Sequence, residues 1–567
     1  MDIGPASAPP LLQLHGLSLR GPLQQSVIDG LSLQVAAGEI VALIGESGSG
    51  KTMAARSILR LLPPQIQVSA GAVLFEGRDL YALTDTNMRR LRGTAIGMVF
   101  QDPTMSLNPA MRVGAQLVEG LRQSTAMSQR ECLFVAAEML ERVHVPNPVA
   151  CMQQFPHQFS EGARQRIMLA SAMLGKPRLL IADEPTSSLD SLTQHEVMQT
   201  LVSVTKAAGS GVLLITHDLG LVARYADNVV VVHKGQSVEA GPTASVLQTP
   251  RGSYTRALIA ALPGLRKARK AVPASPPLIE ATDVQVAFRA RTWPAQSIPV
   301  LAVDRVSLSL RPGETVAIVG GSGAGKTTLA RALADLQPLS GGSIRFRGMT
   351  LPGSNTLQRQ FRIACQFIFQ DPYSSLDPRH RVSEIVSEPL RHDASSKGRR
   401  RTSVLEMLDS VGLLRLQMRF PHELSAGQRQ RVAIARALVR NPELVIADEP
   451  FSTLDMMTQR QLIELLKVLQ ERHGFACVFI THSLATASEL ADRVMVMHHG
   501  RIVEQGSVDA VFDAPQDPYT RRLLNASNPR NAVLCVLAHQ HQSSMGRTLQ
   551  RGQTRGSTTH TTATEGP

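Results

Sequence analysis

Two segments of the chain have the residue spacing of a phosphate-binding loop. The pattern G-x-x-x-x-G-K-[ST] occurs at residues 45–52 and again at residues 320–327. Each copy follows an apolar run that predicts a strand, at residues 40–44 and 315–319, and precedes a helix-compatible stretch, which is the context the motif needs. In such a loop, backbone N–H groups and the lysine bind phosphates, and the threonine hydroxyl binds Mg²⁺. The residues predicted to bind a nucleotide are Gly45, Ser47, Gly48, Gly50, Lys51 and Thr52, and Gly320, Ser322, Gly323, Gly325, Lys326 and Thr327.

An acidic pair follows an apolar run downstream of each loop. The runs L-L-I-A-D-E at residues 179–184 and L-V-I-A-D-E at residues 444–449 predict buried strands that end in two carboxylates. A buried acid is costly unless it serves a cation, so Asp183 and Asp448 are predicted to support Mg²⁺. Their neighbours, Glu184 and Glu449, are placed to polarise an attacking water. The pair alone is equally compatible with a strand end that meets solvent; after a phosphate-binding loop it favours a hydrolytic site.

The chain contains an internal repeat. A constant offset of 265 residues separates Ser160 from Ser425, Asp183 from Asp448 and His217 from His482. Alternating strand-like and helix-like stretches in each copy predict an α/β fold. We expect an N-terminal extension at residues 1–10, one domain at residues 11–262 and another at residues 278–528. A short, basic, proline-containing linker at residues 263–277 joins them, and a polar tail at residues 529–567 has no core to bury.

The bulk composition narrows the class of protein. A length of 567 residues suggests several domains, and 4% aromatic content does not favour stacking on single-stranded nucleic acid. The net charge of +13 fits a solvated basic surface, nucleic acid or an anionic membrane. The chain has neither an apolar run long enough to span a bilayer nor a signal-peptide pattern. Its five cysteines are scattered, which predicts free thiols in a reducing compartment and hence a cytosolic location.

Further motifs resemble those of ABC-type ATPases, whose signature is L-S-G-G-Q. Residues 424–428 read L-S-A-G-Q, and residues 159–163 read F-S-E-G-A. Glutamines in F-Q-D-P resemble the Q-loop, S-L-D and T-L-D resemble the D-loop, and T-H resembles the H-loop. The ordered set occurs twice and covers nearly all of residues 11–528. The resemblance implies two tandem P-loop NTPase domains, each with a RecA-like core, an antiparallel β subdomain and a helical subdomain.

In this family, two head-to-tail domains hold two ATP molecules and Mg²⁺ between them. Each ATP then lies between the P-loop of one domain and the signature of the other. The resemblance assigns the signature residues Ser160, Gly162, Ser425, Gly427 and Gln428 to the γ-phosphate. It assigns His217 and His482 to the γ-phosphate beside the catalytic glutamates, and Gln101 and Gln370 to nucleotide and Mg²⁺. An aromatic often stacks on adenine; Phe288 is the candidate, with a role in the strand core as the alternative.

Local sequences narrow the resemblance to one importer branch. The segments after both Q-loops, F-P-H before both signatures, and P-Y-T-x-x-L-L-like ends resemble oligopeptide/dipeptide/nickel importers, and the fused pair is similar to glutathione-import ATPases. The resemblance implies uptake of peptide-like solutes through two membrane permeases, a separate solute-binding protein, and a peripheral place on the cytoplasmic face of the inner membrane. Residues 102–158 and 371–422 would contact the permeases. The alternatives are a soluble twin-ABC ATPase acting on ribosomes or nucleic acid, and a non-hydrolysing scaffold.

The two copies depart from the family pattern at different places. In the first signature, Glu161 replaces a glycine and Ala163 replaces the glutamine; in the second copy, Phe451 and Ser483 replace the usual Thr and Asp. A carboxylate near a γ-phosphate is unfavourable. Because head-to-tail pairing joins the P-loop containing Lys51 to the intact second signature, we predict that the first site does most of the hydrolysis.

Overall fold

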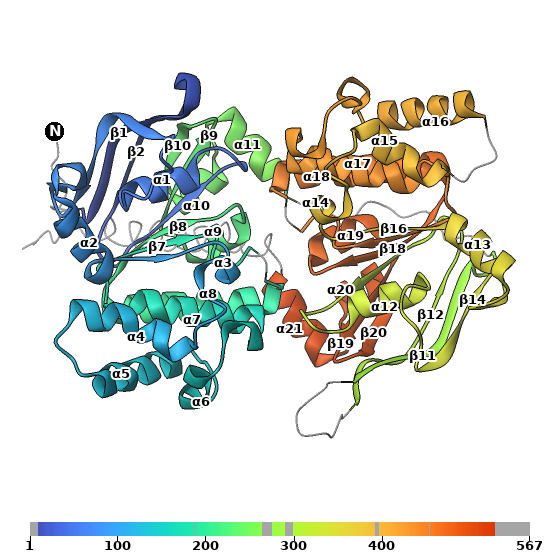
Figure 1. The fold of residues 1–567 in the computed structure, drawn as a ribbon, viewed down its shortest axis with the longest axis horizontal. Coiled ribbons are helices and arrows are strands. Elements are labelled where there is room, and N and C mark those ends of the chain that lie inside the picture. Colours follow the sequence, from blue (N-terminus) through green and yellow to red (C-terminus); the bar gives the residue numbers. More distant parts are fainter. Residues whose placement is uncertain are drawn as a thin grey trace, which may run out of the picture.

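The computed structural model describes residues 10–187, 189–262, 275–289, 299–391, 396–452 and 454–527. They form two domains that lie side by side, the first drawn in blue to green and the second in yellow-green to red (Figure 1). The predicted N-terminal extension and linker fall almost entirely outside the described residues, and the predicted tail falls completely outside them, so those boundaries stay predictions. No helix in the described ranges is both long and apolar enough to cross a bilayer.

Each domain is built on a six-stranded sheet. The first sheet has the order β10 (Gln236–Pro242), β9 (Asn228–His233), β3 (Ile40–Ile44), β8 (Gly211–Ile215), β7 (Leu179–Asp183) and β6 (Ile96–Val99). The second repeats it as β20 (Arg501–Ser507), β19 (Arg493–His498), β13 (Thr315–Val319), β18 (Ala476–Thr481), β17 (Leu444–Asp448) and β16 (Cys365–Ile368). The pairs β9–β10 and β19–β20 are antiparallel and the other pairs are parallel.

The strand order brings the predicted site residues to one edge of each sheet. β3 and β7 both pair with β8 in parallel, so their carboxyl ends meet on the same side. β13 and β17 flank β18 in the same way. The parallel strands are buried on both faces by helices and by a second sheet, which explains their unbroken apolar runs.

A smaller antiparallel sheet covers the P-loop side of each core. In the first domain it contains β2 (Ser26–Val35), β1 (Leu12–Arg20), β4 (Gln67–Phe75) and β5 (Arg78–Asp79). In the second it contains β12 (Pro299–Leu310), β11 (Ile279–Arg289), β14 (Gly341–Phe346) and β15 (Met349–Leu351). Apolar side chains of these sheets share one core with α1 (Lys51–Ile58) or with α12 (Lys326–Leu333).

A cluster of helices forms the third part of each domain. In the first domain these are α4 (Val113–Ser124), α5 (Gln129–Arg142), α6 (Pro148–Gln153) and α7 (Glu161–Met173). Their counterparts are α15 (Val382–Ser387), α16 (Lys397–Ser410) and α17 (Ala426–Leu438). The remaining helices of the first domain are α2 (Asp85–Thr94), α3 (Pro103–Ser106), α8 (Ser191–Ala208), α9 (Leu219–Tyr225), α10 (Thr243–Gln248) and α11 (Ser253–Ala260). Those of the second are α13 (Asn355–Ala364), α14 (Pro372–Ser375), α18 (Met456–His473), α19 (Leu484–Leu490), α20 (Val508–Asp513) and α21 (Pro518–Ser527). The predicted α/β class with three parts per domain is therefore confirmed.

The two domains meet through elements that carry equivalent positions in the repeat. Leu192 of α8 packs against the cluster of the second domain that contains α21, and Met457 of α18 packs against the first-domain cluster that contains α11. The Arg224 guanidinium donates to the carbonyl of Asn525 across the junction at 3.3 Å. In Figure 1, α21 correspondingly lies beside the first domain near α8, and α18 lies beside α11.

Candidate functional site

The first P-loop leaves β3 and closes on the start of α1. Gly50 has φ +99°, and a Cβ there would lie 2.8 Å from the carbonyl oxygen of Val27, so both conformation and space require glycine. Lys51 is buried, and its ammonium donates to the carbonyls of Gly45 at 2.9 Å and Glu46 at 2.7 Å. Burial lowers the pKa of Lys51. The loop therefore holds a poorly solvated cation at the end of the strand.

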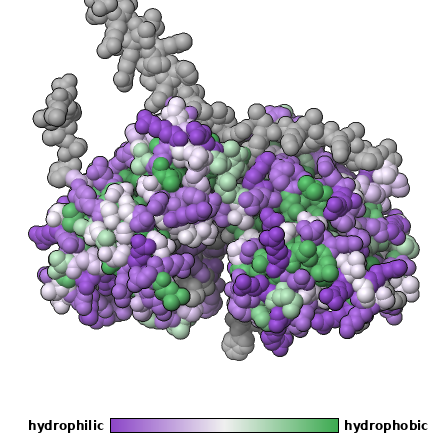
Figure 2. Space-filling model, turned by 90° about the horizontal axis from the view of Figure 1, so that it is seen from above, coloured by the Kyte–Doolittle hydropathy of each residue, from purple (hydrophilic) through white to green (hydrophobic). Residues whose placement is uncertain are grey.

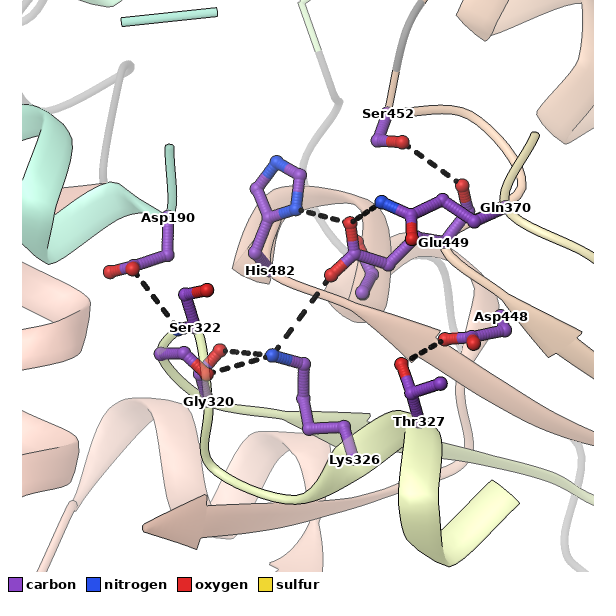
Figure 3. A network of polar contacts seen from close by, with 12 residues as sticks. Asp190, Gly320, Ser322, Lys326, Thr327, Gln370, Asp448, Glu449, Ser452 and His482 are labelled. Carbon is purple, nitrogen blue, oxygen red and sulfur yellow. Dashed lines mark hydrogen bonds and ion pairs between the residues drawn. The ribbon is translucent and has the colours of Figure 1, made fainter. Parts of the chain in front are cut away.

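The second P-loop repeats this arrangement between β13 and α12. The Lys326 ammonium donates to the carbonyls of Gly320 and Gly321, both at 2.9 Å (Figure 3). Gly325 has φ +101°, and a Cβ there would lie 2.1 Å from the carbonyl oxygen of Ala302. Burial lowers the pKa of Lys326 as well. The two predicted cradles are thus equivalent in geometry.

A threonine hydroxyl and a buried aspartate meet beside each lysine. Thr52 Oγ1 donates to Asp183 Oδ1 at 3.2 Å, and Thr327 donates to Asp448 at the same distance. Burial raises the pKa of Asp183 to about 6, and burial also raises the pKa of Asp448. A divalent cation would offset the cost of each buried carboxylate, and hydroxyl and carboxylate oxygens are ligands that Mg²⁺ accepts. The residues therefore fit the predicted ion.

The glutamate after each aspartate is held by a histidine and a glutamine. Glu184 contacts His217 Nδ1 at 3.3 Å and accepts from the Gln101 amide at 3.1 Å. Burial alone would raise the pKa of Glu184, but the hydrogen bond and charge of His217 hold it below its usual value. The carboxylate is therefore ionised at neutral pH and can accept a proton from water.

The second domain has the same group with slightly different distances. Glu449 contacts His482 Nδ1 at 3.2 Å, and the Gln370 amide at 3.4 Å (Figure 3). Both glutamates have left-handed backbones, with φ +46° at Glu184 and +43° at Glu449. Non-glycine residues in this region are uncommon and cluster at functional sites. No local sequence pattern indicates this strain. The nucleotide and Mg²⁺ contacts expected for the glutamines remain predictions.

The second site is lined by both domains. Its pocket contains the loop residues 322–328, Gln370, Glu449 and His482 of the second domain together with Glu161 and Asp190 of the first. Asp190 Oδ2 accepts the backbone N–H of Ser322 at 3.0 Å (Figure 3). Asp190 is the aspartate of the S-L-D motif, which resembles the D-loop. Glu161, the unusual signature residue, therefore lines the same pocket as Lys326.

The second domain also places a carboxylate near the first P-loop. The negative charge of Asp455, the counterpart of Asp190, opposes the effect of burial on the pKa of Lys51. Burial raises the pKa of Tyr254, whose hydroxyl contacts this loop, and the charge of Asp455 adds to that rise.

The signature serines begin helices, and here the two copies differ. Ser425 Oγ accepts the N–H of Gln428 at 3.3 Å, and the Gln428 side chain accepts the N–H of Ser425 at 2.9 Å, which is a capping box. Ser160 accepts the N–H of Ala163 at 3.3 Å, but alanine cannot return the bond. The first signature therefore lacks the side-chain partner that fixes the second.

The signature glycines are required by close packing. A Cβ at Gly162 would lie 2.3 Å from the Thr193 methyl group, and one at Gly427 would lie 2.5 Å from the Thr458 methyl group. Thr193 and Thr458 follow the D-loop aspartates and are hydrogen-bonded to them. Each signature is thus packed against the D-loop helix of its own domain.

Phe288 does not belong to the strand core. It lies on β11 opposite Val300 and its side chain is 45% exposed. The pocket of the second site includes Ala302 of the neighbouring strand but not Phe288. The core alternative is therefore wrong, and adenine stacking stays a prediction.

The structure also explains why the second copy has Phe451 and Ser483 in place of the usual Thr and Asp. In the first domain, the Gln194 amide donates to Thr186 Oγ1 and Asp218 Oδ2, both at 3.2 Å. Asp218 also caps α9 by accepting the N–H groups of Gly220 and Leu221. A single polar network therefore joins the loop that follows Glu184, helix α8 and the loop that follows His217.

The second domain replaces that network with an aromatic pair. Phe451 is 3% exposed and its ring centroid lies 5.7 Å from that of Phe479. The Gln459 amide, the counterpart of Gln194, donates to Thr486 Oγ1 at 3.3 Å. Ser483 caps α19 by accepting the Thr486 N–H at 3.2 Å. Phe451 and Ser483 therefore together replace the Thr186 and Asp218 that Gln194 joins in the first domain.

Phe451→Ala should lower the free energy of unfolding of the second domain by about 3–5 kcal/mol, because it removes a buried ring and leaves a cavity. Phe134→Ala, at a side chain that is 65% exposed, should change it by less than about 0.5 kcal/mol. Chemical denaturation of both full-length variants measures the difference. Equal effects would show that Phe451 is not a packing residue.

Comparisons with known proteins agree with this geometry. The family "ABC transporter" matches residues 28–187 and 303–452, and "Oligopeptide/dipeptide transporter, C-terminal region" matches residues 238–298 and 503–543. "Peptidoglycan transport ATP-binding protein YejF" of Agrobacterium fabrum is 41% identical over 92% of this chain and 97% of its own. "Glutathione import ATP-binding protein GsiA" of Escherichia coli K12 is 40% identical over 88% of this chain and 86% of its own.

Two nucleotide-binding cores of this kind, with every ABC motif in order, define an ABC-type ATPase. The chain belongs to the ABC transporter family. Within that family it carries, in both halves, the C-terminal region of the oligopeptide/dipeptide transporters. The family resemblance and the ATPase activity predicted from the sequence are confirmed.

Proposed function

We propose that this chain hydrolyses ATP to drive the import of peptide-like solutes, such as dipeptides, oligopeptides or glutathione, through partner permeases. The observation that carries the proposal is the match to import ATP-binding proteins along nearly the whole chain. The transporter C-terminal region in both halves favours an importer over a soluble twin-ABC protein acting on ribosomes or nucleic acid.

Each site would take one ATP and one Mg²⁺. Thr52 with Asp183, and Thr327 with Asp448, would hold the ion, assisted by Gln101 and Gln370. The ion would neutralise phosphate charge. Glu184 and Glu449 would accept the proton of the attacking water, with His217 and His482 orienting them. In each site the P-loop lysine would bind the β- and γ-phosphates.

The signature of the opposite domain would complete each site. Its serine and glycine would add donors around the γ-phosphate, which stabilises the transferred group electrostatically. ATP would then favour the closed arrangement of the two domains, and hydrolysis would release it. That two-state change is what the permeases would follow.

The partners would be two integral-membrane permeases and a separate solute-binding protein, with this chain peripheral on the cytoplasmic face of the inner membrane. Support comes from a groove in the second domain lined by Leu336, Phe367, Phe369, Pro389 and Arg436. Leu336 is 57% exposed and Phe369 is 38% exposed. Part of the groove belongs to residues 371–422, the segment predicted to contact a permease. Figure 2 shows apolar residues gathered on the lobe of the second domain within a mostly hydrophilic surface. We infer that a cytoplasmic helix of a permease fills this groove.

Leu336→Glu should weaken the association with the permeases about tenfold, because an exposed apolar anchor becomes charged. Val468→Glu, at an equally exposed side chain on α18, should leave it unchanged. Pull-down of the permeases by the tagged full chain measures both, and ATP binding should be unaffected by either. Retention of permeases by Leu336→Glu would remove the groove from the interface.

Purification of the tagged chain in detergent from its own host tests the function as a whole. We expect two multi-span permeases to co-purify, and ATP-dependent uptake of labelled peptide into vesicles that contain the complex and receive the binding protein. Recovery of ribosomes or nucleic acid in place of permeases would support the soluble alternative.

A further inference from the structure

A tyrosine from the C-terminal helix of each domain contacts the P-loop. Tyr254 of α11 accepts the backbone N–H of Glu46 at 3.0 Å, and Tyr519 of α21 accepts the backbone N–H of Gly321 at 2.8 Å. The contacts join residues about 200 positions apart in sequence. Both P-loop residues follow the first glycine of the motif.

The peptide group that each tyrosine binds is the one that holds the P-loop lysine. Its carbonyl belongs to Gly45 or Gly320, and that oxygen accepts the ammonium of Lys51 or Lys326 at 2.9 Å. Because a peptide group is planar, its N–H and C=O cannot turn independently. The tyrosine hydroxyl and the lysine ammonium are therefore coupled through one rigid unit.

Each tyrosine ring stacks on a histidine of its own domain. The ring of Tyr254 stacks on His233 with centroids 4.1 Å apart, and that of Tyr519 stacks on His498 at 3.9 Å. Burial raises the pKa of Tyr254 to about 12, so its hydroxyl stays neutral at physiological pH. A neutral hydroxyl can accept from the loop without placing a negative charge near the phosphates.

The helices that carry these tyrosines are anchored to the edge strand of the core sheet. Glu239 of β10 accepts the N–H groups of Arg251 and Gly252 at 2.8 and 3.1 Å, just before α11. Glu504 of β20 accepts those of Gln516 and Asp517 at the same distances, just before α21. Both helices, and both edge strands except their first two residues, belong to the matched C-terminal region.

The same helices also contact the opposite domain. Leu192 packs in the cluster that contains Tyr519, and Met457 packs in the cluster that contains Tyr254. In the second site, the N–H of the next P-loop residue, Ser322, binds Asp190 of the first domain. In the second P-loop, two adjacent backbone N–H groups are therefore bound, one by the C-terminal helix of the same domain and one by the other domain.

We propose that Tyr254 and Tyr519 are positioning residues of the two ATP sites: each hydroxyl fixes the peptide group that places the P-loop lysine for the phosphates. The contact recurs although the P-loop residue is glutamate in one copy and glycine in the other, so it does not depend on that side chain. It gives the transporter C-terminal region a role in nucleotide binding that acts through the P-loop lysine. This inference rests on the ATP sites of the proposed function.

The test is Tyr254→Phe in the full chain, in a Lys326→Ala background so that the first site reports. Loss of one hydrogen bond to the loop should weaken ATP binding about threefold to tenfold. The KM for ATP should rise by the same factor while kcat stays within about twofold, because the tyrosine does not touch the reacting atoms. Equilibrium titration with a fluorescent ATP analogue, displaced by ATP, measures the affinity.

Tyr81→Phe in the same background is the matched control. The Tyr81 hydroxyl donates to the carbonyl of Ser57 at 3.0 Å, so this variant loses a similar bond on the far end of α1. It should bind ATP like its parent. Equal ATP affinity for Tyr254→Phe and its parent would overturn the inference, as would an equal loss in Tyr81→Phe. Failure of the unaltered chain to bind ATP would instead count against the proposed function.

Discussion

Replacing Glu184 with glutamine should reduce the ATPase rate of the assembled complex by a factor of about 10² to 10⁴, which is the usual contribution of a general base. Glu449→Gln should reduce it by no more than about twofold. The two glutamates have nearly the same surroundings, with a histidine at 3.3 or 3.2 Å and a glutamine amide at 3.1 or 3.4 Å. We therefore attribute the expected difference to the signature that each site meets.

Steady-state ATPase assays of the two variants in the complete complex measure this asymmetry. ATP binding should persist in both, because glutamine keeps the size of the side chain and the P-loops are untouched. Equal losses, or a larger loss for Glu449→Gln, would contradict unequal sites. Single-turnover measurement of bound ATP shows whether one blocked site simply stalls the other.

The parts of the site that follow from spacing along the chain were predictable from the sequence. The P-loops, the strands before them and the acidic strand ends are local patterns, and parallel strands fix where their ends meet. The observed β3, β7, β13 and β17 agree with the apolar runs to within one residue. The pairing of the two domains came only through the family resemblance.

Contacts between distant residues were not predictable. The Tyr254–Glu46 contact and the Gly162–Thr193 contact depend on how whole elements pack, and no local pattern encodes them. The motif P-Y-T served as a mark of the family branch and gave no hint of a P-loop contact. Phe451 and Ser483 each looked like an isolated departure, because the network that they jointly replace spans three separate segments. For Phe288, the sequence left a role in the strand core open, and only the packing of the sheet shows that its side chain is exposed.

Restoring the first signature should activate the second site. Glu161→Ala combined with Ala163→Gln gives the first copy the S-A-G-Q sequence of the second. In a Glu184→Gln background, where the first site is silent, we expect the residual ATPase rate to rise about tenfold. At an effective dielectric constant of about 20, unit charges about 4 Å apart repel by roughly 4 kcal/mol, and partial exposure of Glu161 reduces this. Relief of about 1.4 kcal/mol corresponds to the tenfold gain.

The double change matters because Glu161 also has a structural effect. As the first residue of α7, its carboxylate favours the helix N-terminus by about 0.3–1 kcal/mol. The Ala163→Gln change should offset that loss, because the new side chain can return the capping bond to Ser160, as Gln428 does to Ser425. The melting temperature should therefore stay close to that of the parent, so a change in the ATPase rate reports the site.

The converse pair, Ala426→Glu with Gln428→Ala in an otherwise unaltered chain, should lower the ATPase rate of the complex about tenfold. If both pairs leave the rate within twofold of their parents, the signature charge does not set the asymmetry, and the exchange at positions 451 and 483 beside the second catalytic pair becomes its structural source.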